Sequence, residues 1–123
     1  MRALLALLLI PVLSLAQAPV PMEFPADSAR LTDDHLRQRV TGKVFKVKPA
    51  DGTSWRLEFK DNGYSFLDTS RGYRDSGKWR VENAQLCIDW QRAAGGCSDV
   101  RLKDELLFLK RTSNGEIVSL QAD

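Results

Sequence analysis

The chain has 123 residues with 18 basic and 16 acidic side chains, one histidine, two cysteines and a formal net charge of +2. A chain of this length suits one domain with one modest hydrophobic core. The near balance of charge excludes the broad electrostatic attraction on which nucleic-acid binding depends, so we expect no nucleic-acid partner.

The first residues have the three-part layout of a secretory signal peptide. Met1-Arg2 gives a positive start, Ala3–Leu15 is an apolar run, and small residues follow at Ala16 and Ala18. The run is shorter than the roughly 20 apolar residues that cross a bilayer. We therefore predict a signal peptide over 1–16, with an alternative end at residue 18, and no transmembrane anchor after processing. The exported protein is expected in the periplasm, with the extracellular medium as the alternative.

Three prolines follow the predicted signal peptide, at Pro19, Pro21 and Pro25. Proline has no backbone N–H and fixes φ, so such a run favours extended chain over helix or sheet. We predict an extended, poorly packed leader over 17–30, followed by a single β domain over 31–123.

A short helix is expected at Asp33–Val40. Thr32 is a favourable N-cap residue, and two acidic residues in the first turn suit the positive end of the helix dipole. Leu31 and Leu36 have the spacing of a hydrophobic staple, and Gly42 stands where a helix usually stops.

From Gly42 onward, turn-forming sequences recur about every ten residues. They are Ala50-Asp51-Gly52, Asp61-Asn62-Gly63, Ser70-Arg71-Gly72, Glu82-Asn83-Ala84, Ala94-Gly95-Gly96, Lys103-Asp104 and Ser113-Asn114-Gly115. Each gap has the length of a strand and leaves little room for helical crossovers. The predicted fold class is mainly β: an antiparallel up-and-down meander that closes into a small barrel of about eight strands, with one short N-terminal helix.

Alternation of apolar and polar residues assigns the faces of these strands. The inward face is expected to hold Trp55, Leu57, Phe59, Gly77, Trp79, Val81, Leu86, Ile88, Trp90, Val100 and Leu102. Asp75 shares this parity, and a carboxylate there must find hydrogen-bond partners or have a raised pKa. The continuous apolar run Leu106–Leu109 is expected to be covered on both faces, one of them by the N-terminal helix.

Both cysteines fall on the outward face of their strands. Cys87 shares parity with Asp89, and Cys97 shares parity with Asp99 and Arg101. Two separate strand patterns thus place both sulfurs on one side of one hairpin. In an exported chain, a disulfide between them is the expected pairing. A redox-active pair usually has only two residues between its cysteines, so that alternative is not favoured.

No set of residues in the sequence suits catalysis or metal binding. His35 is the single histidine, and nothing in the sequence supplies a nucleophile beside it. One histidine and two oxidised cysteines do not make a zinc site. We expect no catalytic residue, no metal and no cofactor; an enzyme centred on Asp75 or His35 is the least favoured alternative.

A basic row on the outward face marks a candidate ligand or partner surface. The row is Arg71, Arg74, Lys78 and Arg80, and a second row is Lys43, Lys46 and Lys48. If the two rows lie close, they would suit anionic partners such as lipid headgroups or cell-wall polymers. The alternative is a solvated face balanced by acids such as Glu58 and Asp89. The candidate surface is therefore Asp75, Trp79, Arg74, Lys78 and Arg80. The many aromatic residues fall mostly on core faces, and the alternative is that some of them line a ligand cavity.

The order of these features resembles a group of small exported β-proteins of proteobacteria. The shared features are the helix, Gly42, Asp51-Gly52, Gly77-x-Trp79, Leu86-Cys87, Cys97 and Asn114-Gly115. The resemblance implies a periplasmic location and a small lipocalin-like (calycin-like) barrel, and it implies no catalytic residue.

Three functions are carried forward. The first is a periplasmic, non-catalytic binding module for an unknown small ligand. The second is an inhibitor or immunity-type protein that acts on a partner protein in the cell envelope, because a rigid domain loses little entropy on binding. The third is a hydrolase, which is the least favoured.

Overall fold

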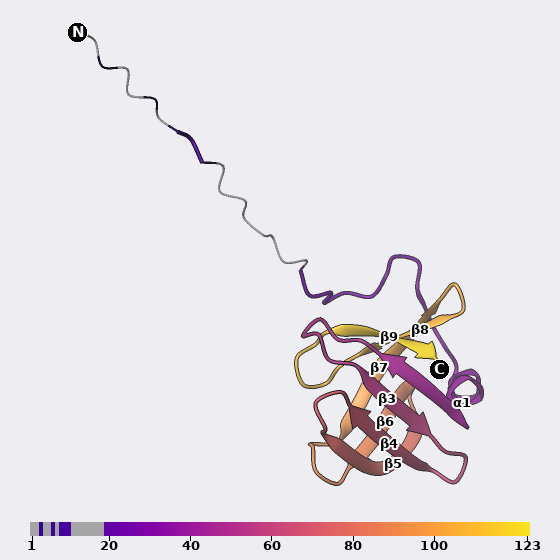
Figure 1. The fold of residues 1–123 in the computed structure, drawn as a ribbon. Coiled ribbons are helices and arrows are strands. Elements are labelled where there is room, and N and C mark those ends of the chain that lie inside the picture. Colours follow the sequence, from indigo (N-terminus) through magenta and orange to yellow (C-terminus); the bar gives the residue numbers. More distant parts are fainter. Residues whose placement is uncertain (1–2, 4–5, 7, 11–18) are drawn as a thin grey trace.

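The structure, a computed structural model, describes residues 3, 6, 8–10 and 19–123. Both cleavage points considered for the signal peptide, after residue 16 or 18, lie outside this part. Within it the chain forms nine strands and one helix (Figure 1). In chain order they are β1 (Ala29–Arg30), α1 (Asp33–Val40), β2 (Lys43–Val47), β3 (Trp55–Phe59), β4 (Tyr64–Thr69), β5 (Arg74–Glu82), β6 (Gln85–Trp90), β7 (Gly96–Lys103), β8 (Leu106–Lys110) and β9 (Ile117–Ala122). Among the described residues, no helix is long and apolar enough to cross a membrane.

Strands β2 to β9 form a closed antiparallel barrel of eight strands. Each strand pairs with the next in the sequence, and β9 returns to pair with β2 at Phe45 opposite Ala122 and Lys46 opposite Gln121. The predicted mainly β fold, with an up-and-down barrel of about eight strands and a short helix, is confirmed. Strand closure gives every barrel strand two neighbours, so little unpaired sheet edge remains.

The core lies inside the barrel, on the face that the alternation predicted. Leu57, Phe59, Val81 and Leu86 are all buried. Gly77 shows why one inward position carries no side chain: a Cβ there would overlap the backbone carbonyl group of Asp89 on β6. The strands β5 and β6 can therefore approach closely at this point.

The helix α1 covers one end of the barrel. Leu36 and Val40 are fully buried in the core, and the Thr32 hydroxyl accepts a hydrogen bond from the His35 N–H, as an N-cap residue does. The predicted helix is confirmed with the same bounds. The Asp33 carboxylate accepts a bond from the backbone N–H of Ala84 in the β5–β6 turn, which fastens the helix to the barrel. We call this the closed end; it also holds the turns at 60–63, 83–84 and 104–105.

Residues 19–30 of the predicted leader are mostly exposed, but they make specific contacts with the barrel. The Ile117 N–H donates to the Pro21 carbonyl oxygen, and the Arg101 guanidinium lies 4.8 Å from the centre of the Phe24 ring. Strand β1 pairs with the C-terminal half of β7, where β7 extends past its pairing with β6. Phe24 thus packs against Arg101 of β7, whose partner on β8 is Phe108. In the apolar run of β8, Leu107 and Leu109 are buried in the core, whereas Leu106 and Phe108 are partly exposed.

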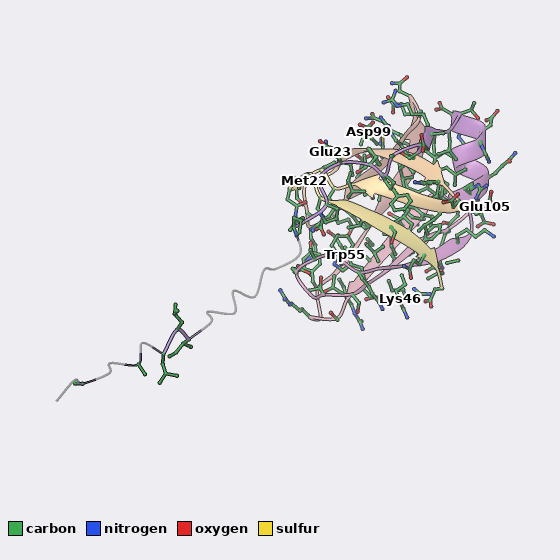
Figure 2. The ribbon with its side chains drawn as sticks, turned by 90° about the horizontal axis from the view of Figure 1, so that it is seen from above. Met22, Glu23, Lys46, Trp55, Asp99 and Glu105 are labelled. Carbon is green, nitrogen blue, oxygen red and sulfur yellow. A yellow bond between two sulfur atoms is a disulfide. The ribbon has the colours of Figure 1, made fainter. Side chains whose placement is uncertain are left out.

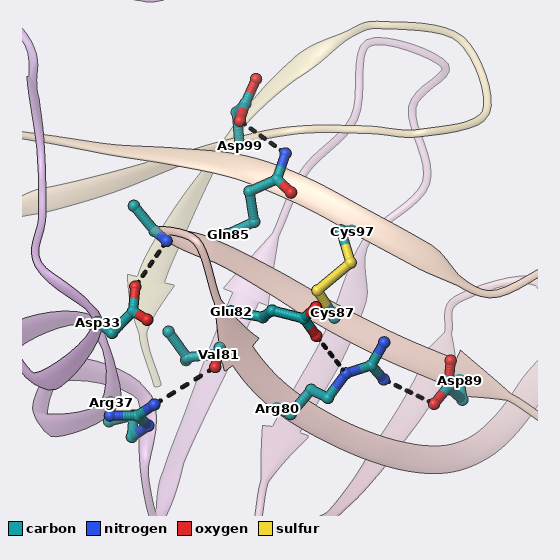
Figure 3. The surroundings of a disulfide bond; sticks show 11 residues. Asp33, Arg37, Arg80, Val81, Glu82, Gln85, Cys87, Asp89, Cys97 and Asp99 are labelled. Carbon is teal, nitrogen blue, oxygen red and sulfur yellow. Dashed lines mark hydrogen bonds and ion pairs between the residues drawn. A yellow bond between two sulfur atoms is a disulfide. The ribbon is translucent and has the colours of Figure 1, made fainter.

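Cys87 and Cys97 form a disulfide, as predicted. They lie directly opposite each other on β6 and β7 (Figure 3). Although Cys87 is on the outward face, it is fully buried, because Arg80 lies opposite it on β5 and Cys97 flanks it on the other side. The Arg80 guanidinium is held there by Glu82 and Asp89, at 2.9 Å and 2.7 Å.

Candidate functional site at the open end of the barrel

The end of the barrel opposite the helix contains a cavity of about 470 Å³. It lies between the connections at 48–54, 70–73, 91–95 and 111–116, and we call this end the mouth. Its walls are mainly apolar and include Trp55, Leu57, Leu67, Ile88, Trp90 and Leu109. Figure 2 shows the helix and Glu105 on one side of the barrel and Trp55 and Met22 towards the other. The helix fills the closed end with Leu36 and Val40, whereas no helix of the described residues enters the mouth.

Asp75 is buried beside the mouth and has its hydrogen bonds satisfied. Its carboxylate accepts bonds from the Tyr73 hydroxyl (3.0 Å) and from the backbone N–H groups of Ser76 (2.8 Å), Arg92 (3.1 Å) and Ala93 (2.9 Å). Burial raises the pKa of this carboxyl, but the bonds from Ala93, Arg92, Tyr73 and Ser76 lower it more, so the pKa of Asp75 lies below its ordinary value of 3.8. Asp75 therefore acts as a fixed anchor that ties the 91–95 loop to β5.

The same contacts affect Tyr73. Burial raises the pKa of its phenol, and the hydrogen bond to Asp75 and the charge of that carboxylate raise it further. The hydroxyl thus stays protonated and keeps donating to Asp75. The Arg92 guanidinium lies 4.7 Å from the centre of the Tyr73 ring, so the aromatic side chain holds a cation at the rim.

A second buried carboxylate, Glu116, fixes the other side of the mouth. Its side chain is about 5% exposed and accepts bonds from the Ala50 N–H at 2.8 Å and from Arg111 Nη1 at 2.9 Å. The Arg111 guanidinium lies 4.6 Å from the centre of the Trp55 ring, which lines the cavity. Glu116 therefore joins the 48–54 and 111–116 connections and holds Arg111 over an aromatic wall.

Two further charged residues stand at the rim. Arg71 Nη2 donates to the backbone oxygen of Asp51 at 3.3 Å. The Asp51 carboxylate accepts bonds from the Thr53 hydroxyl and N–H, and these bonds lower its pKa. Both residues line the cavity, so the rim combines guanidinium groups with carboxylates that are already bonded.

The residues that the sequence proposed as a candidate surface are not brought together. Asp75 lies beside the mouth, but Trp79 lies near the closed end, where its Nε1 donates to the Lys60 carbonyl oxygen at 2.9 Å. Its ring packs edge-on against Phe59, with 5.6 Å between centroids. Parity assigned both residues to the inward face, but it gave no information on their height along the barrel axis.

The basic residues of β5 lie outside the barrel and have partners of their own. Arg74 pairs with Asp68 at 2.9 Å, Arg80 pairs with two acids, and the Lys78 ammonium lies 5.9 Å from the centre of the Tyr64 ring. In the second basic row, Lys43 and Lys46 lie on β2, and β3 and β4 lie between β2 and β5 in the sheet. Lys48 and Arg71 lie instead in the connections at the mouth, outside both strands.

His35 is exposed on α1 at the closed end, where Arg39 Nε donates to its Nε2 at 3.4 Å. It is thus at the opposite end of the barrel from Asp75. Over the part of the chain that the structure describes, no group of three histidine, cysteine or acidic side chains could hold a metal ion.

Sequence reasoning missed Arg111 and Glu116. The only local signal was a carboxylate placed directly before the apolar pair Ile117-Val118, where an acidic side chain must find partners. The partners are a backbone group 66 residues away and an arginine five residues away, and only the closed barrel brings them together.

Comparison with known proteins finds no match among family models, curated proteins or solved structures. The chain does have the small barrel that the resemblance implied, and it has the Cys87–Cys97 disulfide that strand parity predicted. Membership of a particular family stays a prediction.

Proposed function

We propose that the protein is an exported, non-catalytic binding module that holds a small ligand in the mouth of the barrel. The observation that carries this proposal is the aromatic-walled cavity of about 470 Å³ at the open end. Sites for small molecules are typically concave, mostly apolar and about 300–1,000 Å³ in volume, with a few polar groups at fixed positions. Trp55 and Trp90 supply the apolar walls, and Arg71 and Arg111 supply the polar groups.

The construction of the mouth also supports binding. Asp75 fixes the 91–95 loop, and Glu116 fixes the two connections on the other side. The disulfide joins β6 and β7 next to the 91–95 loop. A site that is ordered before the ligand arrives loses less conformational entropy when it binds. The disulfide also supports export, because such bonds persist in oxidising compartments.

Phenylnaphthylamine, a neutral aromatic dye that fluoresces more strongly in apolar surroundings, tests the proposal. We expect saturable binding with one dye per protein. Ser98→Phe should abolish it, because Ser98 lines the cavity opposite Leu86 and a phenyl ring there would fill the space. Ser119→Phe is the matched control, because Ser119 lies on β9 opposite Phe108, outside the cavity.

Circular dichroism and urea unfolding should first show that both variants are folded. If the wild-type protein binds neither phenylnaphthylamine nor its sulfonated analogue anilinonaphthalene sulfonate, or if Ser98→Phe binds dye as well as Ser119→Phe, the mouth is not a ligand site. In that case the inhibitor or immunity-type function becomes the leading hypothesis.

A further inference from the structure

We propose that the ligand of the mouth is an aromatic acid, that is, a planar ring system that carries a carboxylate or sulfonate group. This inference rests on the proposed function and adds the chemical class of the ligand. The rim leaves many of its hydrogen-bond donors open, whereas most of its carboxylate oxygens already accept hydrogen bonds.

Three guanidinium groups stand at or beside the rim, and each has five N–H donors. Within residues 19–123, Arg111 donates from its side chain to Glu116, Arg71 donates to the Asp51 carbonyl oxygen, and Arg92 Nη1 donates to the Arg74 carbonyl oxygen at 2.8 Å. Most of their N–H groups therefore have no protein acceptor in the described structure. Planar guanidinium groups match the paired oxygens of a carboxylate well.

The carboxylates of the same region are in the opposite situation. Asp75 accepts from four donor groups, Asp51 from the hydroxyl and N–H of Thr53, and Glu116 from Ala50 and Arg111. The formal charges of the three arginines and three carboxylates balance, so net charge does not decide the ligand. Both oxygens of Asp75 and of Glu116 accept hydrogen bonds, whereas Asp51 accepts both of its bonds on Oδ1. In the described structure the rim therefore leaves many more donors than acceptors open, and this excess of donors favours an anion over a cation.

The cavity walls indicate the other half of the ligand. Trp55 and Trp90 line the cavity together with Tyr73. Aromatic walls bind planar rings through offset-stacked or edge-to-face contacts. The arginines lie over two of these rings, Arg111 over Trp55 and Arg92 over Tyr73, so cationic groups stand directly beside aromatic surface. A rigid ring also loses less conformational entropy on binding than a flexible chain does.

Anilinonaphthalene sulfonate and phenylnaphthylamine have the same ring system and differ by one sulfonate group, so together they test the acidic group. We expect the wild-type protein to bind the sulfonate dye about tenfold more tightly than the neutral dye, as a charge-assisted hydrogen bond would give. Arg71→Gln should lower the affinity for the sulfonate dye about three- to tenfold. It should change the affinity for the neutral dye less than about twofold.

Arg56→Gln is the matched control for Arg71→Gln, because Arg56 lies on the outer face of β3 and does not line the cavity. It makes the same change in net charge and should affect neither dye. The double variant Arg111→Gln, Glu116→Gln removes the second guanidinium together with its buried partner, which avoids leaving an unpaired carboxylate in the core. We expect the double variant to lower the affinity for the sulfonate dye by a similar factor.

The outcomes separate the two proposals. If both dyes bind the wild-type protein with equal affinity, the proposal that the ligand carries an acidic group is refuted. The same holds if Arg71→Gln and the double variant behave like Arg56→Gln. In both cases the proposed binding function stands. If neither dye binds, the proposed function itself fails. Displacement of the sulfonate dye tests the ring: naphthoate should compete at concentrations at least about tenfold lower than decanoate, and equal competition would refute an aromatic ligand.

Discussion

Replacement of Asp75 by asparagine tests the anchor that holds the 91–95 loop. The side chain is buried and accepts hydrogen bonds from the Tyr73 hydroxyl and from three backbone N–H groups. Asparagine has the same shape but keeps one acceptor oxygen, and its NH₂ group must face donors. A hydrogen bond to a charged acceptor contributes about 1.5–3 kcal/mol, and such bonds are not additive when they share one side chain. With about two bonds lost, we expect Asp75→Asn to lower the free energy of unfolding by roughly 3 kcal/mol.

Urea unfolding followed by tryptophan fluorescence measures this change, and Asp68→Asn is the matched control. Asp68 lies on the neighbouring strand, its side chain is 45% exposed, and it pairs only with the exposed Arg74 in the described structure. Loss of such a surface pair costs less than about 1 kcal/mol. If Asp75→Asn destabilises the protein no more than Asp68→Asn, the anchor does not exist in solution.

The pH dependence gives an independent check. The pKa of Asp75 is lower in the folded protein than its ordinary value of 3.8, so the carboxylate stabilises the fold fully above that value. Its contribution is lost as the pH falls through the folded-state pKa. The difference in unfolding free energy between the wild-type protein and Asp75→Asn should therefore be constant from about pH 5 to pH 8 and shrink below about pH 4. A difference that stays constant in acid would refute the assignment of an ionised Asp75.

Three further changes test the barrel. Replacing Cys87 and Cys97 by serine should lower the free energy of unfolding by about 2.7 kcal/mol, as expected for a short closed loop. Urea unfolding measures this change, and a reductant should lower the urea midpoint of the wild-type protein only. Gly77→Ala should cost more than about 2 kcal/mol because its Cβ would overlap the backbone of the next strand, whereas Gly52→Ala has open space and should cost only about 1–2 kcal/mol for its φ of +86°. Leu36→Ala should lower the free energy of unfolding by about 2–5 kcal/mol, measured by thermal unfolding. It should leave dye binding unchanged because the helix lies at the closed end, and loss of dye binding in folded protein would contradict this.

The fold could be predicted because its signals are local. Turn residues mark the ends of the strands, a period of two assigns inward positions such as Leu57 and Leu86, and the capping residue Thr32 fixes where the helix begins. The disulfide followed from the same parity, because the two cysteines lie on facing strands of one hairpin.

The candidate site could not be predicted, because it depends on contacts between residues far apart in the sequence. Parity placed Asp75 and Trp79 on one face, but their separation along the axis follows from the direction of β5 relative to the two ends. The contact of Glu116 with Ala50 spans the junction where β9 returns to β2. Whether the barrel is hollow depends on how its ends are filled, and only the structure shows that α1 enters one end and leaves the other open.

The division between the two ends has a consequence for how this protein can change. The helix packs at the closed end, where Phe59 and Leu36, the two largest fully buried side chains, also lie. The connections around the cavity instead carry exposed residues such as Arg71, Ala93 and Thr112. Under the proposed binding function, new loop sequences at those positions would change which ligand binds and leave the free energy of folding nearly constant. One scaffold of this kind could serve many binding specificities, in evolution or in the laboratory.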